Sequence, residues 1–181
     1  MSFADRIRRV HASLAEADIP HAFGGAIAVN WCTPQARVTN DIDINIFISP
    51  EHAESALVGL PAGTEITEEA RQRLLRDGQA RFWWETVPID VFLNTTEFHV
   101  AAASRVETRE FEGAMLPCLA CGDIAVFKAF FDRGKDWMDI EAMTSIGSFD
   151  IDAAMAEIEH LLGPDDPRIA KLAALRNPDD G

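Results

Sequence analysis

The stretch that decides the fold is Asp41-Ile42-Asp43-Ile44-Asn45-Ile46-Phe47-Ile48. Isoleucine occupies every second position, and Asp41, Asp43 and Asn45 lie between the isoleucines. Because successive side chains of a β-strand point to opposite faces, this period predicts a strand over 41–48 with one apolar face. Asp41 and Asp43 then share the other face, one pleat apart.

This pair of carboxylates is the first candidate for a metal site. Two like charges so close together repel each other unless a cation lies between them. Carboxylate oxygens are hard ligands, which suit Mg²⁺. The alternative interpretation is a solvated strand face, because antiparallel sheets often keep one polar side.

A second apolar run, over residues 88–94, contains Asp90 as its only charge. The alternation of this run predicts a strand that buries its other face. If it neighbours the strand at 41–48, three carboxylates converge, and such a set can hold two metal ions for phosphoryl transfer. The alternative is an exposed aspartate on an edge strand.

Gly24-Gly25 ends a short apolar strand predicted at 21–24 and precedes a helix predicted at 26–31. Glycine lets the backbone approach an anion closely, and the start of a helix supplies unpaired N–H donors. The pair is therefore a candidate phosphate site, although most glycine pairs are ordinary turns. Two polar residues lie between this pair and the acidic strand: Arg37 and Thr39.

Lys128 is the single charge of the apolar segment 124–131. A helix that is apolar on nearly every side is buried, and a buried ammonium needs a partner. A triphosphate would be such a partner; the alternative is a lysine that reaches solvent past its apolar neighbours. Asp136 and Asp139 share a helix face, where they bind a substrate hydroxyl, orient Lys128 or form ordinary surface ion pairs.

Taken in order, these motifs resemble a known family. Residues 21–28 (His-Ala-Phe-Gly-Gly-Ala-Ile-Ala) and 37–44 (Arg-Val-Thr-Asn-Asp-Ile-Asp-Ile) resemble the opening motif of the DNA polymerase β-type nucleotidyltransferase superfamily. Asp90 matches the third metal-binding carboxylate of that pattern. Within the superfamily the chain looks most like the AbiEii-type toxin nucleotidyltransferases, because residues 123–133 and 135–140 resemble their helical lysine and the Asp-x-x-Asp helix that follows.

The resemblance implies an enzyme that moves a nucleoside monophosphate from an NTP to an acceptor hydroxyl and releases pyrophosphate. It implies two Mg²⁺ ions held by Asp41, Asp43 and Asp90, with Lys128 on the nucleotide phosphates. The other residues that it assigns to nucleotide binding are Gly24, Gly25, Arg37, Thr39, Asp136 and Asp139.

The acceptor stays open at this point. Resemblance to AbiEii-type toxins implies tRNA, and it allows for a cognate antitoxin protein. The composition favours a small cationic acceptor, as in aminoglycoside-type nucleotidyltransferases: 16 Lys and Arg against 30 Asp and Glu in 181 residues give a formal net charge of −14, which disfavours a polyanion. A non-catalytic binding module and a metal-dependent phosphodiesterase are the rival classes.

Length and element pattern predict one α/β (α+β) domain over residues 1–181. We expect a mixed sheet with flanking helices over about 1–118 and a helical part over about 120–177. The remaining predicted strands are 80–85 and a pair within 105–118. The remaining predicted helices are 3–17, one starting at Ser49, 67–78, one capped by Asp123 and ending near Phe131, 135–143, 151–162 and one starting at Asp166.

Three cysteines are too few, and odd in number, for a secreted disulfide framework. Cys118-Leu-Ala-Cys121 lacks the second ligand pair that zinc normally requires. No apolar run is long enough to cross a membrane, and the first residues do not resemble a signal peptide. We therefore expect a cytoplasmic protein that keeps its thiols reduced and has no membrane partner.

Overall fold

The computed structural model describes residues 1–35 and 38–176. These residues form two compact units. The first contains residues 1–27 and 38–119, and the second contains residues 28–35 and 120–176. The expectation of one domain over the whole chain stays a prediction.

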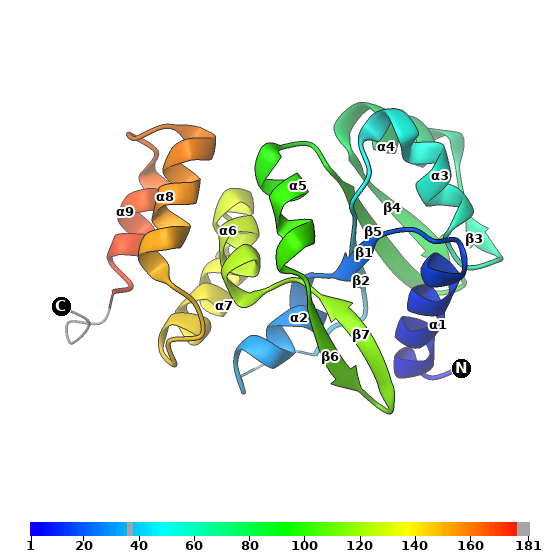
Figure 1. Cartoon of the computed structure of the whole chain (residues 1–181), viewed down its shortest axis with the longest axis horizontal. Coiled ribbons are helices and arrows are strands. Elements are labelled where there is room, and N and C mark those ends of the chain that lie inside the picture. The colour runs from blue at the N-terminus through cyan, green and yellow to red at the C-terminus, as the bar shows by residue number, and fades with distance from the viewer. Residues whose placement is uncertain (36–37, 177–181) are drawn as a thin grey trace. The chain divides into compact units, whose positions relative to one another are not determined.

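The first unit is built on a mixed sheet (Figure 1), whose described strands run in the order β3-β4-β5-β2-β1-β7-β6. Neighbours pair in parallel at β2–β5 and β1–β7, and the other neighbours are antiparallel. The strands are β1 (His21–Phe23), β2 (Ile42–Ile46), β3 (Thr64–Glu65), β4 (Gln79–Trp84), β5 (Val87–Leu93), β6 (Glu107–Phe111) and β7 (Ala114–Cys118).

Several helices accompany this sheet. Thr67 caps α4 by accepting a hydrogen bond from the backbone N–H of Ala70, and Gly78 ends the helix in the left-handed conformation. The helix lies beside β4 and β5 (Figure 1). The helices are α1 (Phe3–Glu16), η1 (Pro50–His52), α3 (Ala53–Val58), α4 (Glu68–Asp77), α5 (Glu97–Ala102) and η2 (Ala103–Arg105), together with the start of α2 (Gly25–Cys32).

The strand predicted at 41–48 forms β2, and the run at 88–94 forms β5. The two strands are parallel neighbours, with Asp43 opposite Asp90. The alternate residues Ile44 and Val91 are fully buried on the other face, which belongs to the core. The period of two therefore predicted both strands and their buried faces correctly.

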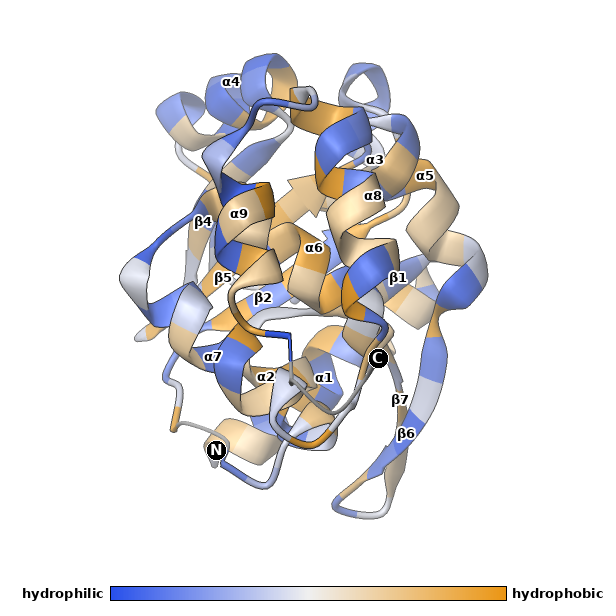
Figure 2. Ribbon diagram, turned by 90° about the vertical axis from the view of Figure 1, so that its left-hand side faces the viewer, coloured by the Kyte–Doolittle hydropathy of each residue, from blue (hydrophilic) through white to orange (hydrophobic). Residues whose placement is uncertain are grey.

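The second unit is helical. It contains the end of α2 and four helices that follow the last strand, and α6 is hydrophobic along most of its length (Figure 2). The prediction that Asp123 caps α6 is wrong, because Ala120 occupies the cap and Asp123 lies buried in the first turn. The four helices are α6 (Cys121–Phe131), α7 (Gly134–Thr144), α8 (Ile151–Leu162) and α9 (Pro167–Ala173). Among the described residues, no helix combines the length and the apolar character needed to cross a membrane.

A disulfide bond joins the two chain segments of this second unit. It links Cys32 at the end of α2 to Cys121 at the start of α6, 89 positions later. The sequence analysis expects reduced cysteines, so this pairing is a correction. Cys118 is a buried free thiol, and burial raises its pKa to about 12, so it stays protonated. The two cysteines of the Cys-x-x-Cys motif are therefore not paired with each other in this structure.

Candidate active site

Three carboxylates meet on the polar face of the sheet in the first unit. Asp43 and Asp90 are directly opposite each other on β2 and β5, and Asp41 immediately precedes β2. The side chains of Asp41 and Asp90 are 31% and 18% exposed, so both are accessible from solvent. We call Asp41, Asp43 and Asp90 the carboxylate face. The structure thus brings together the three residues that the sequence assigns to metal binding.

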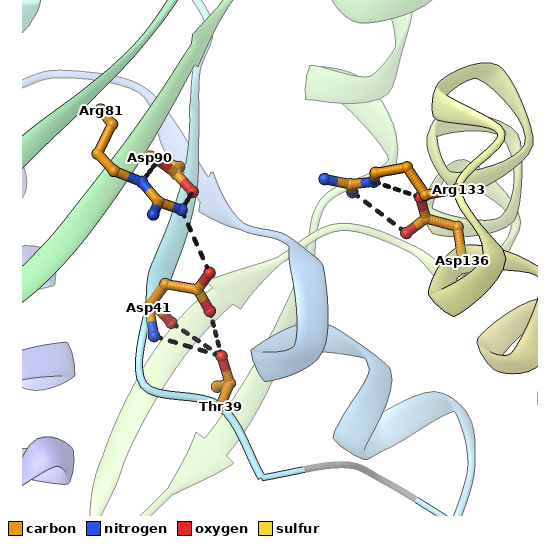
Figure 3. A network of polar contacts seen from close by, with 6 residues as sticks. All are labelled: Thr39, Asp41, Arg81, Asp90, Arg133 and Asp136. Atoms are coloured by element: carbon orange, nitrogen blue, oxygen red, sulfur yellow. Dashed lines mark hydrogen bonds and ion pairs between the residues drawn. The ribbon is translucent and has the colours of Figure 1, made fainter.

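An arginine lies against the carboxylate face (Figure 3). Arg81, on β4, is the register partner of Asp90. Its Nε and Nη2 donate to the two oxygens of Asp90 at 2.7 and 2.6 Å, and Nη2 lies 3.5 Å from Asp41 Oδ2. The hydrogen bond to Asp90 is the main cause that raises the pKa of Arg81, so the guanidinium stays charged. The alternation of residues 80–85 predicts that Arg81 lies beside the site, but no role was assigned to it from the sequence.

Thr39 holds Asp41 from the other side (Figure 3). Its hydroxyl donates to the Asp41 carboxylate and accepts a hydrogen bond of 3.3 Å from the Asp41 backbone N–H. The predicted nucleotide-binding residue Thr39 is therefore next to the carboxylate face, where it orients one carboxylate. The other candidate from this segment, Arg37, lies outside the described residues.

The glycine pair at the start of α2 is packed against the carboxylate face. The backbone N–H of Gly24 donates to the carbonyl oxygen of Asp43 at 2.9 Å. Gly25 has a φ of +51°, and a Cβ at this position would lie 1.8 Å from Asp43 Oδ2. Only glycine fits both the conformation and the space, so the sequence motif reflects close approach between the α2 backbone and a carboxylate.

A buried polar pair lies against the same turn. Asn45 lies on the same face of β2 as Asp43, and its Nδ2 would be 2.7 Å from a Cβ at position 24. Its Oδ1 lies 3.0 Å from Nε2 of His99, on α5. Burial lowers the pKa of His99 to about 4, so the ring is neutral at pH 7 and its Nε2–H donates to Asn45. Sequence analysis missed His99 because it missed the short helix α5, for which the capping residue Thr96 was the available signal.

The second unit contains a separate charged cluster. The Lys128 ammonium, 6% exposed as a residue, donates to Asp139 Oδ2 at 2.7 Å and to Asp136 Oδ1 at 3.4 Å. Arg133 donates to both oxygens of Asp136, at 2.6 and 3.2 Å (Figure 3). The predicted burial of Lys128 is confirmed, and the alternative of a lysine that reaches solvent is wrong. We call Lys128, Arg133, Asp136 and Asp139 the lysine cluster.

The two clusters differ in what they can bind. The carboxylate face offers three hard-oxygen donors around one guanidinium, so its donor chemistry fits a divalent cation. Within residues 1–35 and 38–176, no three His, Cys, Asp or Glu side chains form a ready metal centre, and Arg81 already binds Asp90. In the lysine cluster, by contrast, each carboxylate has a basic partner.

Comparison with solved structures identifies the fold. The chain is similar to an antigenic nucleotidyltransferase-like protein from Paracoccidioides brasiliensis, with a TM-score of 0.57 and 13% identity over 96% of this chain and 92% of that one. The solution structure of the antibiotic-resistance factor ANT(2'')-Ia gives a TM-score of 0.55 and 14% identity over 96% and 88% of the two chains.

A crystal structure of ANT(2'')-Ia in complex with adenylyl-2''-tobramycin gives a TM-score of 0.56 and 15% identity, over 94% of this chain and 97% of that one. No protein-family model and no curated protein sequence matches the chain. The structural similarity shows that the chain has a nucleotidyltransferase-like fold, as the sequence motifs predicted.

Proposed function

We propose that this protein is a nucleotidyltransferase that moves a nucleoside monophosphate from an NTP to an acceptor hydroxyl and releases pyrophosphate. The observation that supports this most strongly is the carboxylate face. Asp43 and Asp90 lie opposite each other on parallel strands, and Asp41 is one pleat from Asp43. The adjoining glycine turn begins α2, where the unpaired backbone N–H groups of a helix start suit a phosphate.

The carboxylate face would hold the two Mg²⁺ ions that the resemblance implies. When bound, these ions would neutralise the triphosphate and stabilise the charge that develops in phosphoryl transfer. In this proposal Asp90 accepts the proton of the acceptor hydroxyl, Thr39 orients Asp41, and the lack of a side chain on Gly25 leaves room for the Asp43 carboxylate. The Lys128 ammonium already has two carboxylate partners. Its contact with the nucleotide phosphates stays a prediction.

The acceptor that we propose is a small cationic molecule that carries a hydroxyl group. A net charge of −14 attracts cations and repels polyanions. Among proteins of similar fold, ANT(2'')-Ia is known in complex with an adenylylated aminoglycoside, adenylyl-2''-tobramycin. The alternative is a tRNA acceptor with a cognate antitoxin partner, which rests on the resemblance of residues 123–140 to AbiEii-type toxins.

The test is a transfer assay. The protein is incubated with Mg²⁺ and each α-³²P-labelled NTP, with either a panel of aminoglycosides and small amino alcohols or pooled tRNA. We expect label on a small cationic acceptor together with released pyrophosphate. Label on tRNA would replace our acceptor with the AbiEii-type one, and tRNA cleavage without label would indicate a nuclease. A folded protein that transfers label to nothing would contradict the proposal and favour a binding module.

A further inference from the structure

Arg81 already binds carboxylate oxygens that a metal ion would need as ligands. Its guanidinium binds both oxygens of Asp90, at 2.6 and 2.7 Å, and reaches toward Asp41 at 3.5 Å. A bidentate arginine–carboxylate pair is the strongest common form of such a contact. Any cation that coordinates Asp90 must therefore share this carboxylate with Arg81 or displace the guanidinium.

Displacement is sterically simple for this side chain. Arg81 is on the polar face of β4, whereas Ala80 and Phe82 on either side of it are buried in the core. The Arg81 side chain is 47% exposed, so it can turn into solvent without opening the core. The pairing of β4 with β5 is made by backbone groups, so it does not depend on the Arg81 side chain.

The charges on this face explain why a cationic side chain, Arg81, lies against it. Asp43 lies opposite Asp90 on the neighbouring strand, so without Arg81 the three carboxylates would repel one another. The guanidinium supplies only one positive charge for the three. A divalent ion supplies more charge in a smaller volume, which gives it a basis to compete with the arginine.

We propose that Arg81 is an internal counter-ion that competes with divalent cations for Asp90 and Asp41, and so sets the cation affinity of the site. This inference rests on the proposed function, because it concerns the same carboxylate face. Arg81 thereby acts as a positioning residue: it keeps the empty face folded and gives way when the ion binds. Loss of the guanidinium should lower the free energy of unfolding of the metal-free protein but raise its affinity for divalent cations.

The test measures Mn²⁺ affinity by electron paramagnetic resonance in the wild-type chain and in three variants. Arg81→Gln removes the charge, and Arg81→Lys keeps the charge but loses the bidentate geometry. The matched control is Arg73→Gln on α4, which removes one positive charge from an exposed pair with Glu69. We expect Arg81→Gln to bind Mn²⁺ roughly tenfold more tightly than either the wild type or the control Arg73→Gln does. Arg81→Lys should lie between.

Other results would overturn this inference. Equal affinity in Arg81→Gln and Arg73→Gln would show that Arg81 does not compete, and weaker binding in a folded Arg81→Gln would show that it helps to build the site. Either result leaves the proposed function standing if the wild type transfers nucleotides. Tighter Mn²⁺ binding without any transfer would instead support Arg81 as a competitor and contradict the proposed function. Absence of Mn²⁺ binding in all four folded proteins would contradict both.

Discussion

The carboxylate face and the lysine cluster are both groups of charged side chains, but they differ in balance and in burial. The carboxylate face has three acids with one base, Arg81, against them, and these side chains are partly exposed. The lysine cluster has two acids and two bases, and Asp136 is fully buried. Removal of one partner from a buried ion pair destabilises a fold, whereas an unbalanced accessible group of carboxylates is suited to bind a cation.

The difference changes the role of Lys128. The sequence predicts a buried ammonium that needs a partner. It offers a triphosphate as that partner, and Asp136 and Asp139 as residues that orient Lys128. In the structure the ammonium is paired with Asp139 and Asp136. The catalytic proposal therefore depends mainly on the first unit, and a contact between Lys128 and the nucleotide phosphates stays a prediction. Five predictions test this division.

The largest effect is expected at the carboxylate face. Asp43→Asn removes one donor and one charge from the centre of the site, so nucleotidyl transfer should fall by at least about 10³-fold. The free energy of unfolding should not fall, because the substitution relieves repulsion from Asp90. Initial rates and chemical denaturation check both parts, with the exposed Asp152→Asn as control. Unchanged turnover in the variant would contradict the mechanism.

The next effect concerns the second unit. Reduction of the Cys32–Cys121 bond removes a link across 89 positions, so it should lower the free energy of unfolding by about 4 to 5 kcal/mol. Denaturation with and without dithiothreitol measures this loss. Thiol titration of the oxidised, unfolded chain should find one free thiol, Cys118. Three free thiols in the purified protein would show that the bond does not form.

The lysine cluster can be broken directly. Lys128→Met leaves Asp139 and Asp136 buried without the ammonium, so the protein should lose about 3 to 5 kcal/mol of stability. Arg73→Gln, in an exposed pair, should change stability very little. Urea denaturation compares the two variants. A small loss in Lys128→Met together with a large loss of transfer would reverse our division and return Lys128 to catalysis.

Acid should destabilise the folded protein through His99, next to the glycine turn. The pKa of His99 is about 4 in the folded protein because the ring is buried, against 6.5 for an ordinary histidine. Between pH 6.5 and pH 4 the unfolded chain therefore binds a proton that the folded chain does not bind. The free energy of unfolding falls as the pH drops through this range. The loss should be about 3 kcal/mol.

Denaturation midpoints between pH 7 and pH 4 measure this loss in the wild type and in His99→Gln. The variant should keep only the part of the slope that comes from other groups. His11 and His21 contribute to that part, since burial lowers their pKa values as well. An identical slope in both proteins would show that His99 is not the titrating group.

The smallest difference that we predict compares two glycines with positive φ. Gly25→Ala places a Cβ on Asp43, whereas Gly113→Ala, at a φ of +81°, meets no atom within 4 Å. Both changes introduce backbone strain, but only the first adds a steric clash. Gly25→Ala should therefore cost about 2 kcal/mol more stability than Gly113→Ala. Equal losses in denaturation would show that Asp43 moves away freely.

The sequence pattern predicted the two central strands of the site. The period of two in residues 41–48 and 88–94 predicts β2 and β5 and places Asp43 and Asp90 on the polar faces. That the two strands are neighbours could only be stated as a condition, because strand order depends on contacts between distant segments. The role of Arg81 was missed for a more local reason: its partnership with Asp90 depends on the register of the β4–β5 hairpin.

Other features could not be predicted from the local sequence pattern. The apolar surroundings of Lys128 predict its burial, but the identity of its partners depends on how α7 packs against α6. Cysteine spacing does not reveal that Cys32 pairs with Cys121. Asp123 has the chemistry of a helix cap, yet the helix begins earlier, at Cys121, so local propensity gave the wrong boundary.

The central claim is that the carboxylate face binds the divalent cation and the lysine cluster does not. Paramagnetic broadening by Mn²⁺ in a ¹H–¹⁵N NMR spectrum of the intact protein tests it most directly, because the ion reports its own position. We predict selective loss of the amide signals of Gly25, of Asp41–Asn45 and of Ile89–Val91. Broadening centred on Asp136 and Asp139, or none at millimolar Mn²⁺, would contradict the account.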